Sequence, residues 1–229
     1  MNTLAIVGYG KMGRMIEQLA PQYDFEIQAR VDMGGDFNAA KDADVAIEFT
    51  EPHAVAANVE RLAAMRVPMV VGTTGWGGEM DRVRAAIENN DARMVWAPNF
   101  SVGVTVFSKL VSEAAHLLAN EPDYAAWAWE IHHSAKKDAQ SGTLLKLVDD
   151  MKRAGYKRAI DAGSNRAGAH PGTHEIGFDS AADTITLRHT ARNRDGFARG
   201  ALKAARWIVD HPDQRGVFEF GDILFRGQI

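Results

Sequence analysis

The 229-residue sequence predicts an α/β protein, with a parallel sheet in its first part and a mostly antiparallel sheet of the α+β kind in its second. Three observations support this fold class. Short apolar runs alternate with helical patterns over roughly the first hundred residues, as in parallel sheets covered by helices on both faces. A glycine-rich turn joins the first run to the first helix. After about residue 120, longer segments alternate apolar and polar residues, as half-exposed strands do.

The elements of the first part follow one another in a regular order. Strands are expected at the short apolar runs Leu4–Val7, Glu26–Val31, Ala43–Phe49, Pro68–Val71 and Met94–Ala97. Helices are expected where apolar residues recur every three or four positions, at Met12–Ala20, Pro52–Arg66, Glu79–Asn89 and Val102–Leu118. Because ligands of such sheets bind at the carboxyl ends of the strands, we expect functional residues in the loops that follow each strand.

The turn after the first strand has the sequence Gly8-Tyr9-Gly10-Lys11-Met12-Gly13. The first glycine allows a tight turn, the second lets the backbone approach a pyrophosphate, and the third lets helix and strand pack closely. The helix N-terminus then faces the phosphates. Asp32 stands about 20 residues further on, at the end of the second strand, where an acid that binds ribose hydroxyls belongs. A glycine turn that binds nothing is the alternative, but the full pattern predicts a Rossmann-type dinucleotide site.

The same residues bear on the choice of cofactor. Asp32 favours a ribose with a free 2′-hydroxyl, and hence NADH. Met33 stands where an arginine would suit a 2′-phosphate. Lys11 and Arg14 are nearby cations that could accept one, so NADPH stays open.

Two later strand ends are candidates for the rest of the cofactor site. The fourth strand ends in Gly72-Thr73-Thr74-Gly75, which offers a flexible backbone and two hydroxyls. The fifth ends in Ala97-Pro98-Asn99-Phe100, which offers an amide and an aromatic ring. Each alone would more often be a simple turn, but both fall where a nicotinamide would lie.

The second part begins with a strand over Tyr124–Ile131, which places Trp127, Trp129 and Ile131 on one face. Such tryptophans more often form a core or a subunit interface than a site, so oligomerisation is expected. Gly172–Phe178 and Thr184–Ala191 flank a turn-like segment and predict an antiparallel pair.

The chain then returns to helical spacing at Ala201–Val209, followed by an apolar tail, Val217–Phe225. Residues 1–100 and 195–229 are therefore expected to form a dinucleotide-binding domain. Residues 101–194 are expected to form a substrate-binding and oligomerisation domain.

The densest run of reactive side chains is Glu130 to Thr143, with His132, His133 and Lys136 in its first half. Ser141-Gly142-Thr143 opens a helical pattern, and the free N–H groups there form a cradle for a carboxylate. An anionic substrate suits this run better than a neutral one. A capped surface loop and a metal site are the alternatives, although no third metal ligand stands at the usual spacing, and we expect no metal. Ser141 lacks the Gly-x-Ser-x-Gly elbow of an acyl-transfer enzyme.

The bulk composition excludes several classes of function. The formal net charge is −4 without a long basic run, which argues against nucleic acid as a partner. There is no cysteine, which removes disulfides, thiolate zinc sites and cysteine nucleophiles and fits a reducing compartment. The N-terminus shows no signal-peptide pattern, and no window approaches about 18 continuous apolar residues. A cytoplasmic protein with no membrane partner is expected.

The run also carries a resemblance to a known family. Its pattern is Glu130-x-His132-His133-x-x-Lys136-x-Asp138-Ala139-x-Ser141-Gly142-Thr143, and it is similar to the signature of 4-hydroxy-tetrahydrodipicolinate reductases, also called dihydrodipicolinate reductases. The resemblance covers nearly the whole chain. It includes the glycine turn and the segments Phe49–Pro52, Gly72–Gly75, Ala97–Val104, Gly172-x-His174 and His189–Ala201. Gln140 stands where the family usually has proline, and Asn193 where it commonly has serine.

The resemblance implies an NADH- or NADPH-dependent reductase of a small cyclic dicarboxylate, on the route to diaminopimelate and lysine. It implies that His132 is the general acid and that Lys136 assists proton transfer. It also implies that His133, Gly142 and Thr143 bind substrate carboxylates, and that the protein is a homotetramer built through the sheets of the second domain. Another Rossmann dehydrogenase, such as an aspartate dehydrogenase-like enzyme, and a cofactor-sensing module without turnover are the competing interpretations.

Overall fold

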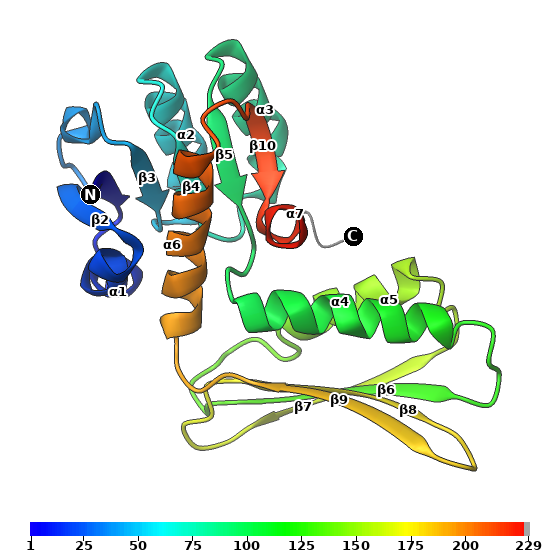
Figure 1. Ribbon diagram of the computed structural model, residues 1–229. Coiled ribbons are helices and arrows are strands. Elements are labelled where there is room, and N and C mark those ends of the chain that lie inside the picture. The colour runs from blue at the N-terminus through cyan, green and yellow to red at the C-terminus, as the bar shows by residue number, and fades with distance from the viewer. Residues whose placement is uncertain (227–229) are drawn as a thin grey trace. The chain divides into compact units, whose positions relative to one another are not determined.

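The computed structural model describes residues 1–226, which form two compact units (Figure 1). Residues 1–102 and the segment from Asp195 onward make up the first unit, and Gly103–Arg194 the second. No helix in the described part of the chain is long and apolar enough to cross a membrane.

The first unit is built on a six-stranded sheet in which every pairing is parallel. The strand order is β10-β5-β4-β3-β1-β2. The strands are β1 (Asn2–Val7), β2 (Phe25–Val31), β3 (Val45–Glu48), β4 (Met69–Val71), β5 (Arg93–Trp96) and β10 (Gly216–Glu219). The chain leaves β1 for β2 in one direction and then crosses back to β3 on the other side. The strand order therefore reverses beside β1, which is where ligands of this architecture bind.

Helices cover both faces of this sheet because both faces of its strands are apolar. Leu4 and Ile6 of β1 point into one buried cluster, and Ala5 and Val7 point into the other. The first cluster is closed by α1 (Lys11–Leu19), α6 (Asp195–Asp210) and α7 (Phe220–Phe225). The second is closed by α2 (Val55–Ala64) and α3 (Met80–Asn89). The fold class predicted from the alternating pattern is confirmed for this unit.

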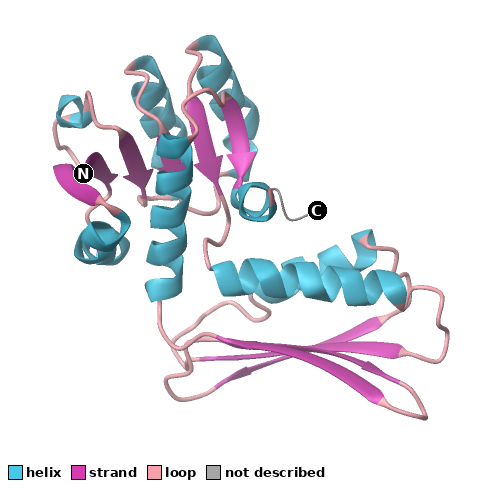
Figure 2. Cartoon of the chain, in the orientation of Figure 1, coloured by secondary structure: helices cyan, strands magenta, loops and turns pink. Residues whose placement is uncertain are grey.

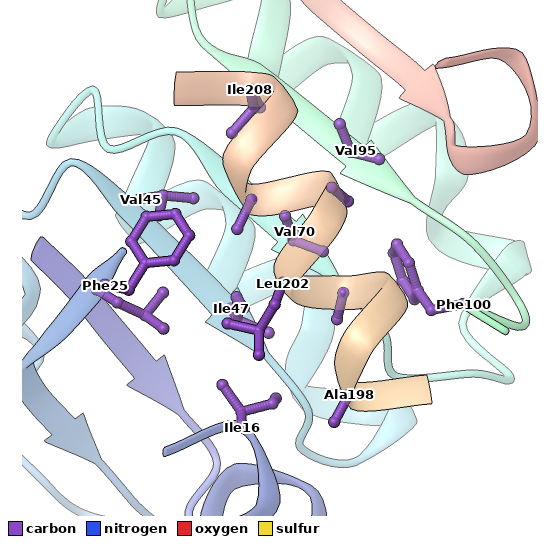
Figure 3. Packing of buried hydrophobic residues seen from close by; sticks show 14 of the residues in the cluster. Ile16, Phe25, Val45, Ile47, Val70, Val95, Phe100, Ala198, Leu202 and Ile208 are labelled. Atoms are coloured by element: carbon purple, nitrogen blue, oxygen red, sulfur yellow. The ribbon is translucent and has the colours of Figure 1, made fainter. Parts of the chain in front are cut away.

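Helix α6 lies across the middle of the sheet and holds the carboxyl ends of its strands in place. Figure 3 shows Leu202 and Ala198 of this helix beside Ile47 and Phe100, the second of which follows β5. A β-carbon at Gly200 would lie 1.7 Å from the carbonyl oxygen of Phe100, so only glycine allows the helix to approach this loop. The helix thereby fixes the loop after β5.

The second unit is a four-stranded mixed sheet with the order β7-β6-β8-β9. Its strands are β6 (Ala125–His132), β7 (Ile160–Arg166), β8 (Thr173–Asp179) and β9 (Thr184–Thr190). Strand β6 is parallel to β7, whereas the pairings β6–β8 and β8–β9 are antiparallel, as the mostly antiparallel prediction required.

Two helices, α4 (Val102–Leu117) and α5 (Gly142–Arg153), lie on one face of this sheet (Figure 2). Their apolar side chains pack on Ala126 and Ala128 of β6 and on Ile176 and Phe178 of β8. Because side chains alternate along a strand, Glu130 and His132 of β6 also point to this covered face.

The opposite face of the second sheet carries the two tryptophans of β6, and no helix of the described second unit covers it (Figure 2). Trp127 lies over Gly177 of β8, where a β-carbon would come within 2.1 Å of the indole ring. Trp129 donates from Nε1 to Asn165 Oδ1 of β7 at 2.6 Å. Both side chains are half-buried within one chain.

Three parts of the fold differ from the expectation. Strand β7 was not predicted, because its sequence Ile160–Arg166 alternates small and polar residues without an apolar run. The tail expected as one apolar segment is divided into β10, which pairs with β5, and α7. Helix α6 begins at Asp195 rather than Ala201, since its first turn is polar.

Candidate active site

The glycine turn after β1 is held by close contacts that exclude side chains at two positions. Gly8 has φ +93°, and a β-carbon there would lie 2.1 Å from the carbonyl oxygen of Phe49. A β-carbon at Gly13 would lie 2.3 Å from the carbonyl oxygen of Gly8, so α1 packs directly on the turn. Gly10, in contrast, borders open space and is the N-cap of α1. The turn therefore leaves room for a ligand at the point where the helix presents its free N–H groups.

A groove of about 790 Å³ lies at the carboxyl ends of β1, β2 and β3 in the first unit. Of the residues predicted to bind a cofactor, Gly8, Gly10 and Asp32 line it. Tyr9, Lys11, Met12 and Gly13 belong to the same turn but do not line the groove. Asp32 accepts the N–H of Met33 on Oδ1 at 3.0 Å, at the end of β2. The reversal point of the sheet and the groove thus coincide.

The far end of the groove is formed by residues that the sequence reasoning did not select. Arg61 of α2 places its guanidinium 5.1 Å from the centre of the Phe37 ring, and both side chains line the groove. Neither Lys11 nor Arg14, the two cations weighed from sequence, lines it. Arg61 lies one helix length beyond the Phe49–Pro52 segment, so only the contact of α2 with Phe37, in the segment that follows β2, could have revealed it.

The ends of β4 and β5 lie further along the sheet and do not line this groove. Thr73 accepts the N–H of Thr50 on Oγ1 at 2.7 Å, which ties the loop after β4 to the loop after β3. Gly72 lies under the Phe49 ring, and a β-carbon there would come within 2.1 Å of it. Thr74 is exposed next to them. The loop after β4 is thus fixed in place with its backbone at the sheet edge.

The loop after β5 differs from the expectation in one respect. Ala97 and Phe100 are core residues, and the Phe100 ring packs 5.0 Å from that of Phe220. The Phe100 ring, which was expected to face a nicotinamide, therefore packs inside the core. Pro98 is exposed, and Asn99 accepts the N–H of Ser101 on Oδ1 at 2.8 Å. This loop offers its backbone and its amide rather than a ring.

A buried carboxyl group joins the loops around the groove. Glu48, the last residue of β3, is fully buried and is bonded by the Thr50 hydroxyl and by Asn58 Nδ2, the latter at 3.2 Å. Burial raises the pKa of Glu48 above its ordinary value, and the hydrogen bonds from Thr50, Thr73 and Asn58 offset only part of that rise. Its Oε2 is buried without a hydrogen-bond partner.

The second unit brings the reactive run together at the end of β6. His132 is the last residue of β6. His133 therefore lies in the loop that follows, where the alternation of side chains between the two faces of the sheet no longer applies. Lys136 follows in that loop and pairs with Asp138, with Nζ 2.8 Å from Oδ1. This pairing lowers the pKa of Asp138. His132, His133 and Lys136 thus gather at one end of the sheet.

Helix α5 starts in the same place. Ser141 is its N-cap and accepts the N–H of Leu144 on Oγ at 3.2 Å. Gly142 and Thr143 are the first two residues of the helix, where N–H groups have no carbonyl partner within the helix. A β-carbon at Gly142 would meet nothing within 4 Å, so this end faces open space. The geometry suits a carboxylate.

One buried carboxylate lies between these two groups. Glu130 Oε1 accepts the N–H of Ser141 at 2.8 Å and Nη2 of Arg166 at 2.8 Å, while Oε2 accepts the Ser141 hydroxyl. Burial raises the pKa of Glu130, but the bonds from Ser141 and Arg166 outweigh it and hold that pKa below its ordinary value. Glu130 is therefore a charged group with no exposed surface.

Two imidazoles complete the cluster. His174 Nε2 lies 3.3 Å from Glu130 Oε2, and His132 Nδ1 lies 3.6 Å from the same oxygen. Burial lowers the pKa of His174 to about 4, with a smaller contribution from His132. Burial also lowers the pKa of His132, whereas the Glu130 carboxylate raises it. His174 is thus neutral near pH 7, whereas the pKa of His132 is lowered by burial and the Glu130 carboxylate offsets only part of that fall.

The three potential ligand atoms of Glu130, His132 and His174 lie within 4.8 Å of one another, which is also the spacing of a metal site. The carboxylate, however, already accepts from Ser141 and Arg166, and the guanidinium is in direct contact with it. A cation there would displace these donors. The hydrogen-bonded cluster accounts for the geometry of these described residues without an ion.

Sequence reasoning assigned no role to Glu130, Arg166 or His174. Glu130 stands in the family signature and His174 in the segment Gly172-x-His174, so the resemblance already pointed to both residues. Arg166 lies at the end of the unpredicted strand β7, and only the parallel pairing of β6 and β7 places it opposite His132.

Family models and known proteins match this chain over almost its full length. Residues 2–100 match the model described as dihydrodipicolinate reductase, N-terminus, and residues 103–224 match the C-terminus model of the same name. A 4-hydroxy-tetrahydrodipicolinate reductase from Christiangramia forsetii is 33% identical over 96% of this chain and 97% of its own length. One from Methanoregula boonei is 35% identical over 94% of each chain.

Solved structures share the fold. A dipicolinate-bound dihydrodipicolinate reductase from Paenisporosarcina sp. TG-14 superposes with a TM-score of 0.81 at 21% identity, over 96% of this chain and 97% of its own. An aspartate dehydrogenase from Thermotoga maritima reaches a TM-score of 0.53 at 14% identity, over 91% and 97% of the two chains. Both likenesses are of fold alone.

Proposed function

This chain belongs to the dihydrodipicolinate reductase family and is an oxidoreductase of lysine and diaminopimelate biosynthesis, and from this premise we propose the chemistry of its site. It reduces 4-hydroxy-tetrahydrodipicolinate to tetrahydrodipicolinate with a nicotinamide cofactor. The observation that carries the proposal is the position of His132 beside the start of α5, where a proton donor and a carboxylate cradle share one buried anchor.

The groove of the first unit would hold the dinucleotide. Gly8 and Gly10 with the start of α1 suit its pyrophosphate, and Asp32 suits a ribose with free hydroxyls. Tyr9, Lys11, Met12 and Gly13 complete that turn. The nicotinamide half would contact backbone and polar groups of the loops after β4 and β5, at Gly72, Thr73, Thr74, Ala97, Pro98 and Asn99. Phe100 supports the second of these loops from the core. The bound cofactor supplies a hydride.

The residues of this groove also bear on the choice between NADH and NADPH. Asp32 favours NADH, because its carboxylate would repel a 2′-phosphate. Arg61 is a cation in the same groove that could offset this repulsion. We propose NADH as the preferred cofactor, with NADPH as a poorer one.

The second unit would bind and protonate the substrate. The N–H groups of Gly142 and Thr143 and the His133 ring would hold its carboxylates, and the Lys136 ammonium would balance their charge. His132, protonated on the ring, would deliver the proton that completes the reduction, with Lys136 assisting. The 4-hydroxyl group leaves as water, one carbon of the resulting unsaturated ring receives a hydride and a neighbouring atom receives a proton, so the two-electron reduction is balanced.

The uncovered tryptophan face suits a subunit interface, and we propose a homotetramer assembled through the sheets of the second unit. The apolar side chains of Trp127, Trp129 and Ile131 along β6 would otherwise lie partly open to water. A cytoplasmic location fits a biosynthetic enzyme without cysteine.

The experiment is a coupled assay in which dihydrodipicolinate synthase makes the substrate from pyruvate and aspartate semialdehyde. Purified protein should oxidise NADH when the synthase is present and not when it is left out. A parallel reaction with oxaloacetate and ammonium tests the aspartate dehydrogenase-like alternative and should give no turnover. Absence of turnover with both NADH and NADPH would refute the proposal.

A further inference from the structure

We propose that Glu130 is a positioning residue that joins the carboxylate-binding end of α5 to the proton donor His132, so that one buried carboxylate orients both. The inference rests on the proposed function, because it takes His132 and the start of α5 as the groups that act on substrate. Glu130 has no exposed surface, so it acts through its neighbours and not by touching substrate.

The link to α5 runs through Ser141. The backbone N–H of Ser141 donates to Glu130 Oε1 at 2.8 Å, and its hydroxyl donates to Oε2. The same hydroxyl caps the helix by accepting the N–H of Leu144. Gly142 and Thr143 follow directly in the chain, so the direction of their N–H groups depends on how Ser141 is held. Glu130 thus holds the N–H groups of Gly142 and Thr143 in place through Ser141.

The link to His132 runs through Oε2. His132 Nδ1 is buried without a hydrogen-bond partner, and it faces Glu130 Oε2 at 3.6 Å. A small approach of the ring would complete an imidazole–carboxylate hydrogen bond, and catalytic hydrogen bonds often tighten when substrate binds. Nδ1 is then held by protein, and Nε2 remains the nitrogen that can serve the substrate.

Glu130 is also the group that favours a charged His132. The charged and titratable groups around His132 come from several elements: Glu130 on its own strand, Arg166 on β7, His174 on β8 with His189 beyond it on β9, and Lys136 and Asp138 in the loop. Burial lowers the pKa of His132, and Lys136 and Arg166 lower it further. Two carboxylates raise the pKa of His132 and so oppose this fall, and Glu130 raises it more than Asp138 does.

His174 sharpens the selection of one proton donor. Both rings face the same oxygen, and their centres are 5.1 Å apart, so two imidazolium ions would repel one another. His174 is the more buried of the two and keeps the neutral form, so it does not compete with His132 for a proton near pH 7.

The test compares wild type with Glu130→Gln, which keeps the shape and removes the charge. The pH profile of kcat should show its basic limb at lower pH in the variant, because His132 loses its proton more easily. At pH 8 kcat should fall by roughly 10–1000-fold. Glu121→Gln is the matched control, since it removes an exposed carboxylate in the same unit and should leave the profile unchanged.

A double-mutant cycle separates positioning from a general structural role. In a His132→Gln background, Glu130→Gln should reduce kcat by no more than about threefold, because its link to the proton donor is gone and its remaining link, to α5, acts on substrate binding and hence on KM. A full additional loss in that background would overturn the proposal. A Glu130→Gln profile that coincides with that of wild type would overturn it as well.

Ser141→Ala tests the link to α5 and keeps the Glu130 carboxylate with its bonds from the Ser141 N–H and from Arg166, so it also serves if Glu130→Gln fails to fold. Dipicolinate, measured by calorimetry without turnover, should bind at least about tenfold more weakly, while the basic limb of the pH profile stays in place. Unchanged dipicolinate affinity would contradict the link. Because binding needs no turnover, these results stand apart from an inactive wild-type enzyme, which would refute the proposed function instead.

Discussion

Gly172 lies directly against the imidazole of His132: a β-carbon at residue 172 would come within 3.0 Å of His132 Nε2. Gly172 also has φ +137°, a conformation that residues with side chains rarely adopt. The residue that precedes β8 therefore sets the space available to the proposed proton donor.

Gly172→Ala should lower kcat by about tenfold or more, because the added methyl group displaces the His132 ring from its place at the site. The backbone strain should also lower the free energy of unfolding by roughly 1–3 kcal/mol. Steady-state kinetics and urea denaturation measure the two effects. Gly77→Ala is the control, since a β-carbon there meets nothing within 4 Å. Wild-type kcat in Gly172→Ala would mean that the ring position does not matter.

Asp32→Ser should raise the ratio of kcat/KM for NADPH to that for NADH, because it removes the carboxylate that repels a 2′-phosphate and binds a ribose hydroxyl. We expect kcat/KM for NADH to fall by about tenfold, with kcat less affected than KM. Asp81→Asn, an exposed change on α3, should alter neither value. A variant with the wild-type cofactor ratio would remove Asp32 from the ribose site.

His174 should make stability depend on pH. The unfolded chain binds a proton on this residue below about pH 6.5, whereas the folded chain does so only near a pKa of about 4. The free energy of unfolding therefore falls as pH drops through this window, by on the order of 3 kcal/mol at its lower end. His132 and His189 act in the same direction, since their pKa values are also lowered.

Urea denaturation at several pH values measures this dependence, and His174→Gln should show a shallower decline from pH 6.5 to pH 4 than wild type. Parallel curves for the two proteins would mean that the histidine is not held neutral.

Trp129→Asp should break the proposed tetramer, because it places a charge on the uncovered face of the second sheet. Light scattering after gel filtration should give a tetramer for wild type and a smaller species for the variant. Leu145→Asp is the control: it adds a charge at an exposed apolar residue of α5, on the covered side of the sheet. A variant that remains tetrameric would place the interface elsewhere.

Local patterns were sufficient to predict most of the fold. The glycine turn and the apolar runs identified β1 to β5, and Ser141 identified the start of α5. Strand β7 could not be predicted, because its small and polar residues form no apolar run and its place in the sheet depends on pairing with β6. Likewise, nothing local indicates that the end of the chain supplies β10 to the first sheet.

The candidate site, too, could be predicted only where its residues are close in sequence. The reactive run from Glu130 to Thr143 was visible because its members are close in sequence. Arg166 and His174 join it only through strand pairing, and Arg61 reaches the cofactor groove only through the position of α2. The burial that makes His174 neutral and Glu130 charged is a property of the packed sheet, which the order of residues does not contain.

The most direct test of the central claim is the coupled assay run with wild type and His132→Gln side by side. Wild type should oxidise NADH only when the synthase supplies substrate, and the variant should show kcat reduced by about 10²–10⁴ with KM little changed. A variant with the kcat of wild type, or a wild-type enzyme that turns over with neither NADH nor NADPH, would contradict the account.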